Sequence, residues 1–162
     1  MRQTPAGIVL PLPSPLLGML PAFLQGLPMK VFWAAWQTFQ LTVSGGATPS
    51  QTLPWTNSPN YWFAGWFGVV SLRSTDFQTD RSSSPLTASI TDNANTIYQT
   101  DGVQVDIRNF FSTAGISAPA VWAQPLIVKP QGSLNLTLTN LDNANAISAQ
   151  PVAMGVLIGP TK

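Results

Sequence analysis

The chain of 162 residues contains no histidine, no cysteine and no glutamate, although it carries six tryptophans, eight phenylalanines and fifteen prolines. The absence of histidine and cysteine removes the imidazole base, the thiolate nucleophile and the preferred protein ligands of zinc and copper. Aspartate is the only carboxylate side chain that remains. These absences exclude most enzyme classes, and we expect a protein that is not an enzyme and uses no cofactor.

Charge is also scarce. Charged residues make up 8% of the chain, against roughly a quarter in typical globular domains. The net charge is +1 and the basic residues do not cluster, so we expect no nucleic-acid partner, because such a surface needs grouped Lys and Arg. A surface with so little charge repels its own copies weakly. We therefore expect a homo-oligomer or an assembled subunit, with a polar monomer as the alternative.

The N-terminal region is apolar but rich in proline. Residues 6–29 carry no charged side chain, yet their five prolines would break a helix repeatedly, and a bilayer cannot satisfy the freed backbone groups. We therefore predict no membrane insertion and instead an extended apolar arm over residues 1–30, ahead of a domain over residues 31–162. The arm's large apolar residues must pack on this domain or on a neighbouring subunit, and we favour the neighbour. The residues expected at that interface are Leu12, Leu16, Leu17, Leu20, Phe23, Leu24 and Leu27.

The remainder of the chain alternates between strand patterns and turn chemistry. Strands are predicted over residues 31–43, 60–72, 86–91, 96–100, 103–107, 121–128, 134–139 and 152–158, with Asp101-Gly102 as a hairpin turn. Residues 45–54, 73–85 and 108–120 read as loops. The expected fold is an all-β, antiparallel β-sandwich of the jelly-roll type with about eight strands.

Two of these strands have unusual composition. Residues 60–72 are apolar on both faces, which predicts a strand buried on both sides or placed between subunits. Gly65 and Gly68 within it indicate a bulge or a close backbone contact. Pro125 interrupts residues 121–128, so that strand is predicted at a sheet edge or with a bulge.

The carboxylates provide no clear catalytic or metal site. Asp76, Asp80 and Asp92 could form the acid pair of a glycosidase, but its general acid must be kept protonated in a buried site. All three lie in predicted loops or turns, where aspartate commonly binds its own backbone. The turn at residues 142–145 lacks the acidic spacing of a calcium loop. We predict no catalytic residue and no metal ligand.

Aromatic residues are the remaining candidates for function. The set consists of Trp33, Trp36, Trp55, Tyr61, Trp62, Phe63, Trp66 and Phe67. The cluster from Tyr61 to Phe67 exceeds what one inward face can hold, so Tyr61, Trp62, Phe63, Trp66 and Phe67 are predicted to contact a partner protein. A carbohydrate-binding or receptor-binding module is an alternative, with Trp55, Tyr61 and Trp62 on an exposed platform.

The C-terminal part of the chain resembles a known family. Residues 125–140 (PLIVKPQGSLNLTLTN), followed by a last apolar strand that ends in Gly155-Val156-Leu157-Ile158-Gly159, are similar to small virion proteins of tailed bacteriophages. The resemblance implies a jelly-roll subunit that decorates or cements a capsid, or belongs to the head–tail region. Its implied partners are the major capsid protein, other virion proteins and its own copies, and its implied location is the virion. A membrane-associated subunit of a lipid-containing virus is a further alternative.

Overall fold

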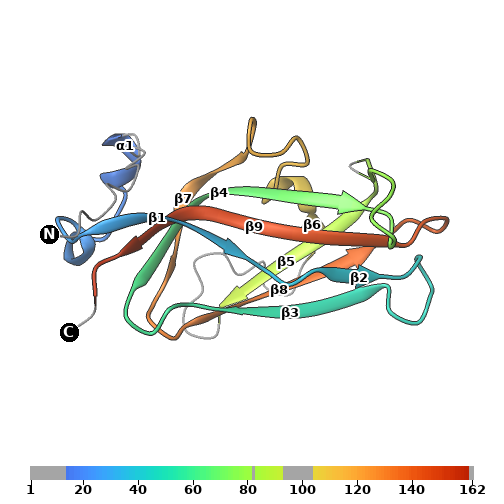
Figure 1. Ribbon diagram of the computed structural model, residues 1–162, viewed down its shortest axis with the longest axis horizontal. Helices are drawn as coiled ribbons and strands as arrows, with labels where there is room; N and C mark the ends of the chain where they lie inside the picture. The colour runs from blue at the N-terminus through green and yellow to red at the C-terminus, as the bar shows by residue number, and fades with distance from the viewer. Residues whose placement is uncertain (1–13, 82, 93–103, 161–162) are drawn as a thin grey trace, which may run out of the picture.

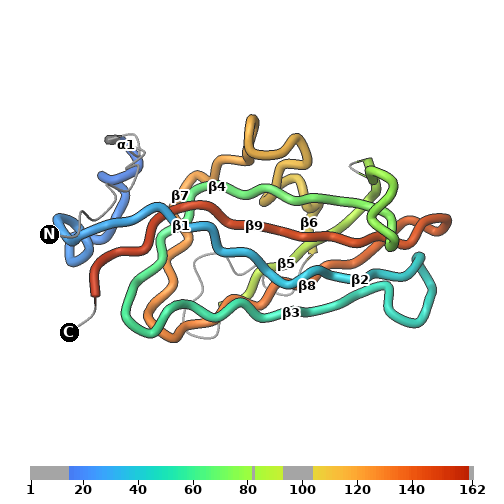
Figure 2. The backbone as a smooth tube through the Cα atoms, in the orientation of Figure 1, coloured from blue at the N-terminus to red at the C-terminus, as the bar shows by residue number. Residues whose placement is uncertain are grey.

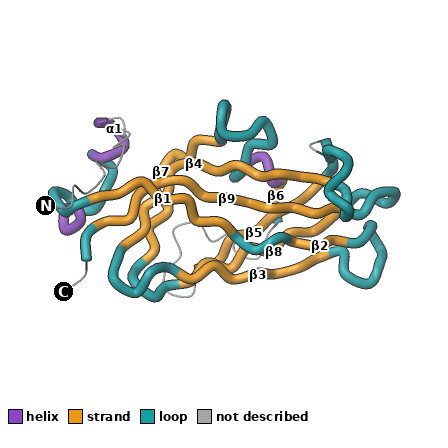
Figure 3. The backbone as a smooth tube through the Cα atoms, in the orientation of Figure 1, coloured by secondary structure: helices purple, strands orange, loops and turns teal. Residues whose placement is uncertain are grey.

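The computed structural model describes residues 14–81, 83–92 and 104–160, and strands dominate it (Figure 3). In chain order the strands are β1 (Met29–Ala35), β2 (Phe39–Leu41), β3 (Ser50–Thr56), β4 (Trp62–Arg73), β5 (Leu86–Asp92), β6 (Val105–Asp106), β7 (Ala120–Val128), β8 (Ser133–Asn140) and β9 (Ile147–Ile158). The helical segments of the described residues are single turns, namely α1 (Ser14–Leu17), η1 (Ala22–Leu24) and η2 (Ile107–Asn109).

The strands form two antiparallel sheets packed face to face (Figures 1 and 2). Sheet A has the order β1-β9-β4-β7, with β2 also pairing with β9, and sheet B has the order β3-β8-β5-β6. Because β1 and β2 pair with successive stretches of β9, they act as one interrupted strand. The pairings β3 with β8, β4 with β7 and β5 with β6 then complete the winding of a jelly roll. The predicted all-β antiparallel sandwich is confirmed.

The main core lies between the sheets and follows the alternation read from the sequence. Leu134, Leu136 and Leu138 of β8 are fully buried, while the residues between them are partly exposed. In β5, Leu86, Ala88 and Ile90 point inward in the same way. Alternate residues of a strand face opposite sides of its sheet, so one apolar residue in two is sufficient to build this layer.

The prediction of a loop over residues 45–54 was wrong at its C-terminal end. Strand β3 begins at Ser50, and Pro54 lies opposite Asn135 of β8. β3 is an edge strand that pairs only with β8, and an edge tolerates proline because one side of the strand needs no donor. The predicted strand 31–43 is also divided into β1 and β2. The predicted strand 96–100 and the Asp101-Gly102 hairpin lie outside the described residues.

Strand β4 is central and has the irregularity that its glycines indicated. It pairs with both β7 and β9, and the register shifts between Gly65 and Phe67. A Cβ atom on Gly155 of β9 would lie 1.9 Å from the carbonyl oxygen of Ala64. Only glycine allows the two strands to approach this closely. β7, which contains Pro125, lies at the edge of sheet A, as predicted.

The described part of the N-terminal arm, residues 14–28, lies at one end of the sandwich (Figure 1). It is not fully extended as predicted, because α1 and η1 each form a turn. Pro15 lies in the first turn of α1 and Pro21 is the N-cap of η1. Proline is tolerated at both places because a first-turn N–H has no partner within its helix.

Candidate interaction surface

The face of sheet A that points away from sheet B, here called the outer face, is the most unusual surface of the molecule. Phe32 and Ala34 of β1 pack toward the main core, so alternation directs Val31 and Trp33 to the outer face. The same reasoning applies to β9, where Leu157 belongs to the main core and Val156 to a second cluster.

Strand register arranges the outer face into transverse rows. Across β1, β9, β4 and β7 the rows are Met29, Ile158 and Trp62; Val31, Val156, Ala64 and Ile127; Trp33, Met154, Phe67 and Val121; and Ala35, Val152 and Val69. Every member of these four rows is apolar, whereas the solvent side of a sandwich sheet is usually polar. Toward β2 the same face continues with polar rows, namely Ser71 with Gln150, and Arg73 with Ser148 and Gln40. The sheet therefore has apolar side chains on both of its faces.

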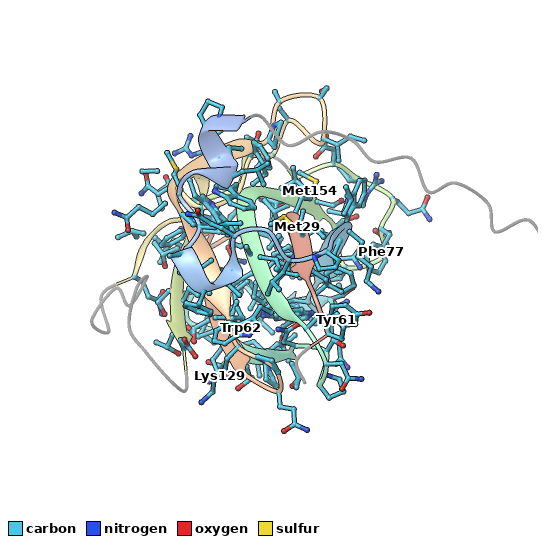
Figure 4. The ribbon with its side chains drawn as sticks, turned by 90° about the vertical axis from the view of Figure 1, so that its left-hand side faces the viewer. Met29, Tyr61, Trp62, Phe77, Lys129 and Met154 are labelled. Carbon is cyan, nitrogen blue, oxygen red and sulfur yellow. The ribbon has the colours of Figure 1, made fainter. Side chains whose placement is uncertain are left out.

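The arm covers the first two rows. Leu20 and Leu24, with relative exposures of 3% and 0%, pack with Ala64, Trp66 and Ile158 into a second apolar cluster. Phe23 adds an edge-to-face contact with Trp62 at 5.1 Å between ring centroids. Figure 4 views the molecule from this end, with Met29 and Trp62 labelled near the pale blue ribbon of the arm. At least this part of the arm packs on its own domain.

The third row is largely uncovered in the described chain, and we call its residues Trp33, Met154, Phe67 and Val121 the open row. Trp33 and Val121, at its two ends, are 53% and 65% exposed. Ile116, in the loop before β7, is 63% exposed and adds to the same side of the molecule. An exposed apolar surface that runs across a whole sheet is typical of an interaction site.

Two grooves border the open row. One, of about 320 Å³, is lined by Trp33, Ile116, Val69 and Val152, with Arg73 and Asp80 also in its wall. The other, of about 470 Å³, lies between the arm and β7 and is lined by Met19, Pro21, Ala123, Gln124, Pro125 and Ile127. The groove beside Trp33 thus combines apolar side chains with polar ones, whereas the lining of the groove beside the arm is mainly apolar.

The structure distributes the residues predicted at an interface over three environments. Leu20, Leu24, Phe63 and Trp66 are buried inside this chain; Leu16, Leu17, Tyr61, Trp62 and Phe67 are partly exposed; Phe23 and Leu27 are exposed. Leu12 lies outside the described residues. Contact of these residues with another protein stays a prediction. The aromatic set included Trp33 without placing it at an interface, and Val121 and Met154 were missed, because only register brings the three together.

The aromatic residues considered for a glycan platform do not share a surface. Trp55 packs into the space between the sheets, 5.2 Å from Phe63 and 6.3 Å from Trp36 between ring centroids. Trp62 instead belongs to the outer face. The Lys30 ammonium lies 4.4 Å from the centroid of the Tyr61 ring, a cation–π contact. An exposed stacking platform of Trp55, Tyr61 and Trp62 is therefore not formed.

Two aspartates that are hydrogen-bonded in turns, Asp76 and Asp142, favour the ionised form, whereas a general acid must be protonated. The Ser74 hydroxyl and the Gln78 N–H both donate to Asp76, and these bonds lower the pKa of its carboxyl. Asp142 accepts from the N–H groups of Ala144 and Asn145, and its pKa is also lowered. Both residues are stabilised as carboxylates, whereas a glycosidase acid must be held protonated.

Within the described residues, no acidic side chains gather in a group of three that could hold a metal ion. In the same part of the chain, no helix has the length and apolar character needed to cross a membrane.

The outer face of sheet B is chemically different. Along β3 and β8, the hydroxyls of Ser50 and Thr139 are 2.6 Å apart, and so are those of Thr52 and Thr137. These residues are opposite each other in the register. They form a hydroxyl-lined surface that water can solvate, here called the hydroxyl face. The outer face of sheet A is thus apolar over the four rows described above, whereas the outer face of sheet B is polar along β3 and β8.

No protein-family model matches this chain, and no curated protein matches it either.

Proposed function

We propose that this chain is a non-enzymatic structural subunit of a virion, which binds the shell and its own copies through the outer face of sheet A. The observation that carries the proposal is the open row, where Trp33, Met154, Phe67 and Val121 align across four strands. An uncharged apolar surface of this kind gains free energy when a partner removes it from water.

The composition of the open row suits a protein contact. Tryptophan and methionine are enriched in interfaces, and tryptophan is among the residues whose truncation weakens binding most. A standard interface buries about 800 Å² on each partner. The open row, the apolar parts of the two grooves and the exposed part of the arm offer an area on which such an interface can form, with Arg73 and Asp80 at its rim.

The two unlike outer faces support a subunit with a fixed orientation. The hydroxyl face has Ser50–Thr139 and Thr52–Thr137 pairs that need no partner protein to satisfy them. The open row has no comparable way to interact with water. A subunit of this kind lies with sheet A against its support and with sheet B toward solvent.

The placement in a virion is supported by the resemblance of residues 125–159 to small tailed-phage virion proteins. Those residues form the end of β7 and all of β8 and β9, which include members of both sheets. Jelly rolls are common in viral capsids but also occur in lectins and cupins, so the fold alone does not assign the role. Low net charge and few charged residues add to the case for a subunit covered by its neighbours.

The proposal is tested by removing the ends of the open row. Trp33→Ser with Val121→Ser is expected to keep the sandwich folded, because both side chains are more than half exposed. A matched control is Phe77→Ser with Leu141→Ser, which removes side chains that are 49% and 52% exposed elsewhere on the molecule. Light scattering of the purified full-length chains reports self-association, and tagged chains produced in the native host report incorporation into purified particles.

We expect the open-row variant to lose self-association and incorporation by at least about 30-fold, as for truncation of an interface hot spot, and the control to behave as the wild type. Equal incorporation of both variants would overturn the proposal. Flotation with liposomes that depended on Trp33 would also overturn it, because the open row would then bind a lipid surface.

A further inference from the structure

The arm is attached to the sandwich in an unusual way. Within the described residues, the backbone hydrogen bonds of residues 14–27 close inside the arm, as from Leu20 N–H to Leu17 and from Leu24 N–H to Pro21. The side chain of Gln25 likewise donates to the Leu20 carbonyl at 2.8 Å. The arm is therefore a self-contained unit, and apolar side chains hold it on sheet A.

The linker between the arm and β1 is exposed and bent. Residues 25–28 are all exposed. Gly26 has a φ of 79°, a left-handed conformation that other residues adopt at a cost, and open space surrounds its Cβ position. The linker leads into β1, which is an edge strand of sheet A. A straightened linker would carry the arm away from its own sheet without disturbing the strand order.

The contact between the arm and sheet A leaves one buried hydrogen-bond donor without a partner among the described residues. The buried Nε1–H of Trp66 has no hydrogen-bond acceptor within the described chain. When the arm lifts, water can satisfy this donor, which reduces the cost of opening. The arm is thus a unit that can leave its site while the sandwich stays folded.

We propose that the arm is exchanged between two copies of this chain, so that residues 14–24 of each copy cover Trp66, Val156 and Ile158 of the other. This inference rests on the assembly proposed above and names one of its contacts. The apolar contacts are the same in the closed and the exchanged forms, so they do not oppose exchange. The exchanged linker is no longer required to turn back, and short bent linkers are known to favour swapping. The result is a closed, two-fold dimer.

The first test distinguishes which copy supplies the arm. The chain has no cysteine, so engineered thiols are the only ones that react. Phe23 and Trp62 touch at 5.1 Å between ring centroids, and Phe23→Cys and Trp62→Cys place one thiol on the arm and one on the sheet. The two single variants are mixed, incubated to allow exchange and treated with a short bis-maleimide. A covalent heterodimer of the two variants is the expected product.

The double variant with both cysteines in one chain is the control that the cross-linker can span positions 23 and 62. If it is cross-linked within single chains while the mixed variants give no heterodimer, the arm stays on its own copy and the inference fails. In that case light scattering can still show association through the open row, so the proposed function would survive. Unchanged association after removal of Trp33 and Val121, with cross-linking between copies retained, would have the reverse meaning: arm exchange would stand and the proposed contact through the open row would fail.

The second test changes the linker. Gly26→Ala makes the bent conformation costly and is expected to raise the dimerisation constant about a hundredfold, since two linkers relax in each dimer. Gly45→Ala is the matched control, because Gly45 has a φ of 82° and equally open surroundings in the loop between β2 and β3. It introduces the same strain without affecting the arm, so its dimerisation constant should equal that of the wild type. Equal constants for both variants would contradict exchange through this linker.

Discussion

Truncation of Leu24 to alanine should release the arm and leave the sandwich folded. Leu24 has a relative exposure of 0% and lies in the cluster between the arm and sheet A. Removing a buried leucine side chain costs about 2–5 kcal/mol. Because the arm's described backbone hydrogen bonds close within it, this loss lowers the free energy of arm opening and not that of global unfolding. The ratio of open to closed arm should rise at least about 30-fold.

Leu136→Ala is the matched control. Leu136 is also 0% exposed, but it lies in β8 between β3 and β5, inside the main core. The same change there costs a similar free energy, about 2–5 kcal/mol. This loss lowers the free energy of global unfolding. Each kcal/mol lowers the Tm of a chain of this size by about 2–4 °C. Leu136→Ala should therefore lower the Tm by several degrees, and Leu24→Ala by much less.

Two measurements separate the outcomes. Amide hydrogen exchange over residues 14–28 should accelerate at least about 30-fold in Leu24→Ala and stay close to wild type in Leu136→Ala under native conditions. Thermal unfolding followed by circular dichroism gives the Tm. A Leu24→Ala protein whose Tm falls as far as that of Leu136→Ala, with unchanged exchange in the arm, would show that arm and sandwich unfold as one unit and would refute the reasoning.

Two further predictions concern the sandwich itself. Gly155→Ala places a Cβ atom 1.9 Å from the Ala64 carbonyl oxygen, so urea unfolding should show a loss of about 3 kcal/mol or more; an unchanged midpoint would contradict the close approach of β9 and β4. The Arg108 guanidinium and N–H lower the pKa of Asp106 from 3.8 to about 2. The small stability that Asp106 contributes is therefore present above pH 4 and lost as the pH falls toward 2. Asp106→Asn should lower stability only slightly at pH 7, since solvent screens this exposed pair. Near pH 1.5 the variant should be as stable as the wild type. A stability difference that persists at that pH would show that it does not come from the Asp106 carboxylate.

Strands with one buried face were readable from the sequence. Residues 134–139 and 86–91 alternate between apolar and polar side chains. β8 has that burial pattern throughout, and β5 has it except at Ser89, which is buried. Both are local patterns with a period of two residues. β3 was missed because Gln51, Thr52 and Pro54 resemble loop composition, and the strand exists only because β8 is available beside it. An edge strand with weak local preference depends on its neighbour.

The candidate surface was only partly predictable. The excess of apolar side chains in residues 60–72 correctly indicated two buried faces, but the direction of each side chain depends on the bulge between Gly65 and Phe67. Trp66 consequently lies under the arm, and Phe63 lies in the main core. Trp33 and Val121 are 88 positions apart in the sequence. Only the pairing of β1 and β4 with β9, and of β4 with β7, brings them into one row, so no local pattern could join them.

The sequence by itself determined the chemistry that this protein lacks, the low charge of its surface and its all-β class, because composition and two-residue periodicity are local properties. Only the tertiary structure decided that the arm covers part of the outer face of sheet A and that Trp33, Met154, Phe67 and Val121 share one row. It also decided that hydroxyl pairs line β3 and β8 on the other outer face. These features depend on strand order and register, which are set by packing between residues far apart in the chain. The absence of histidine, cysteine and glutamate directed attention to the surfaces, and the fold determined which apolar row is exposed.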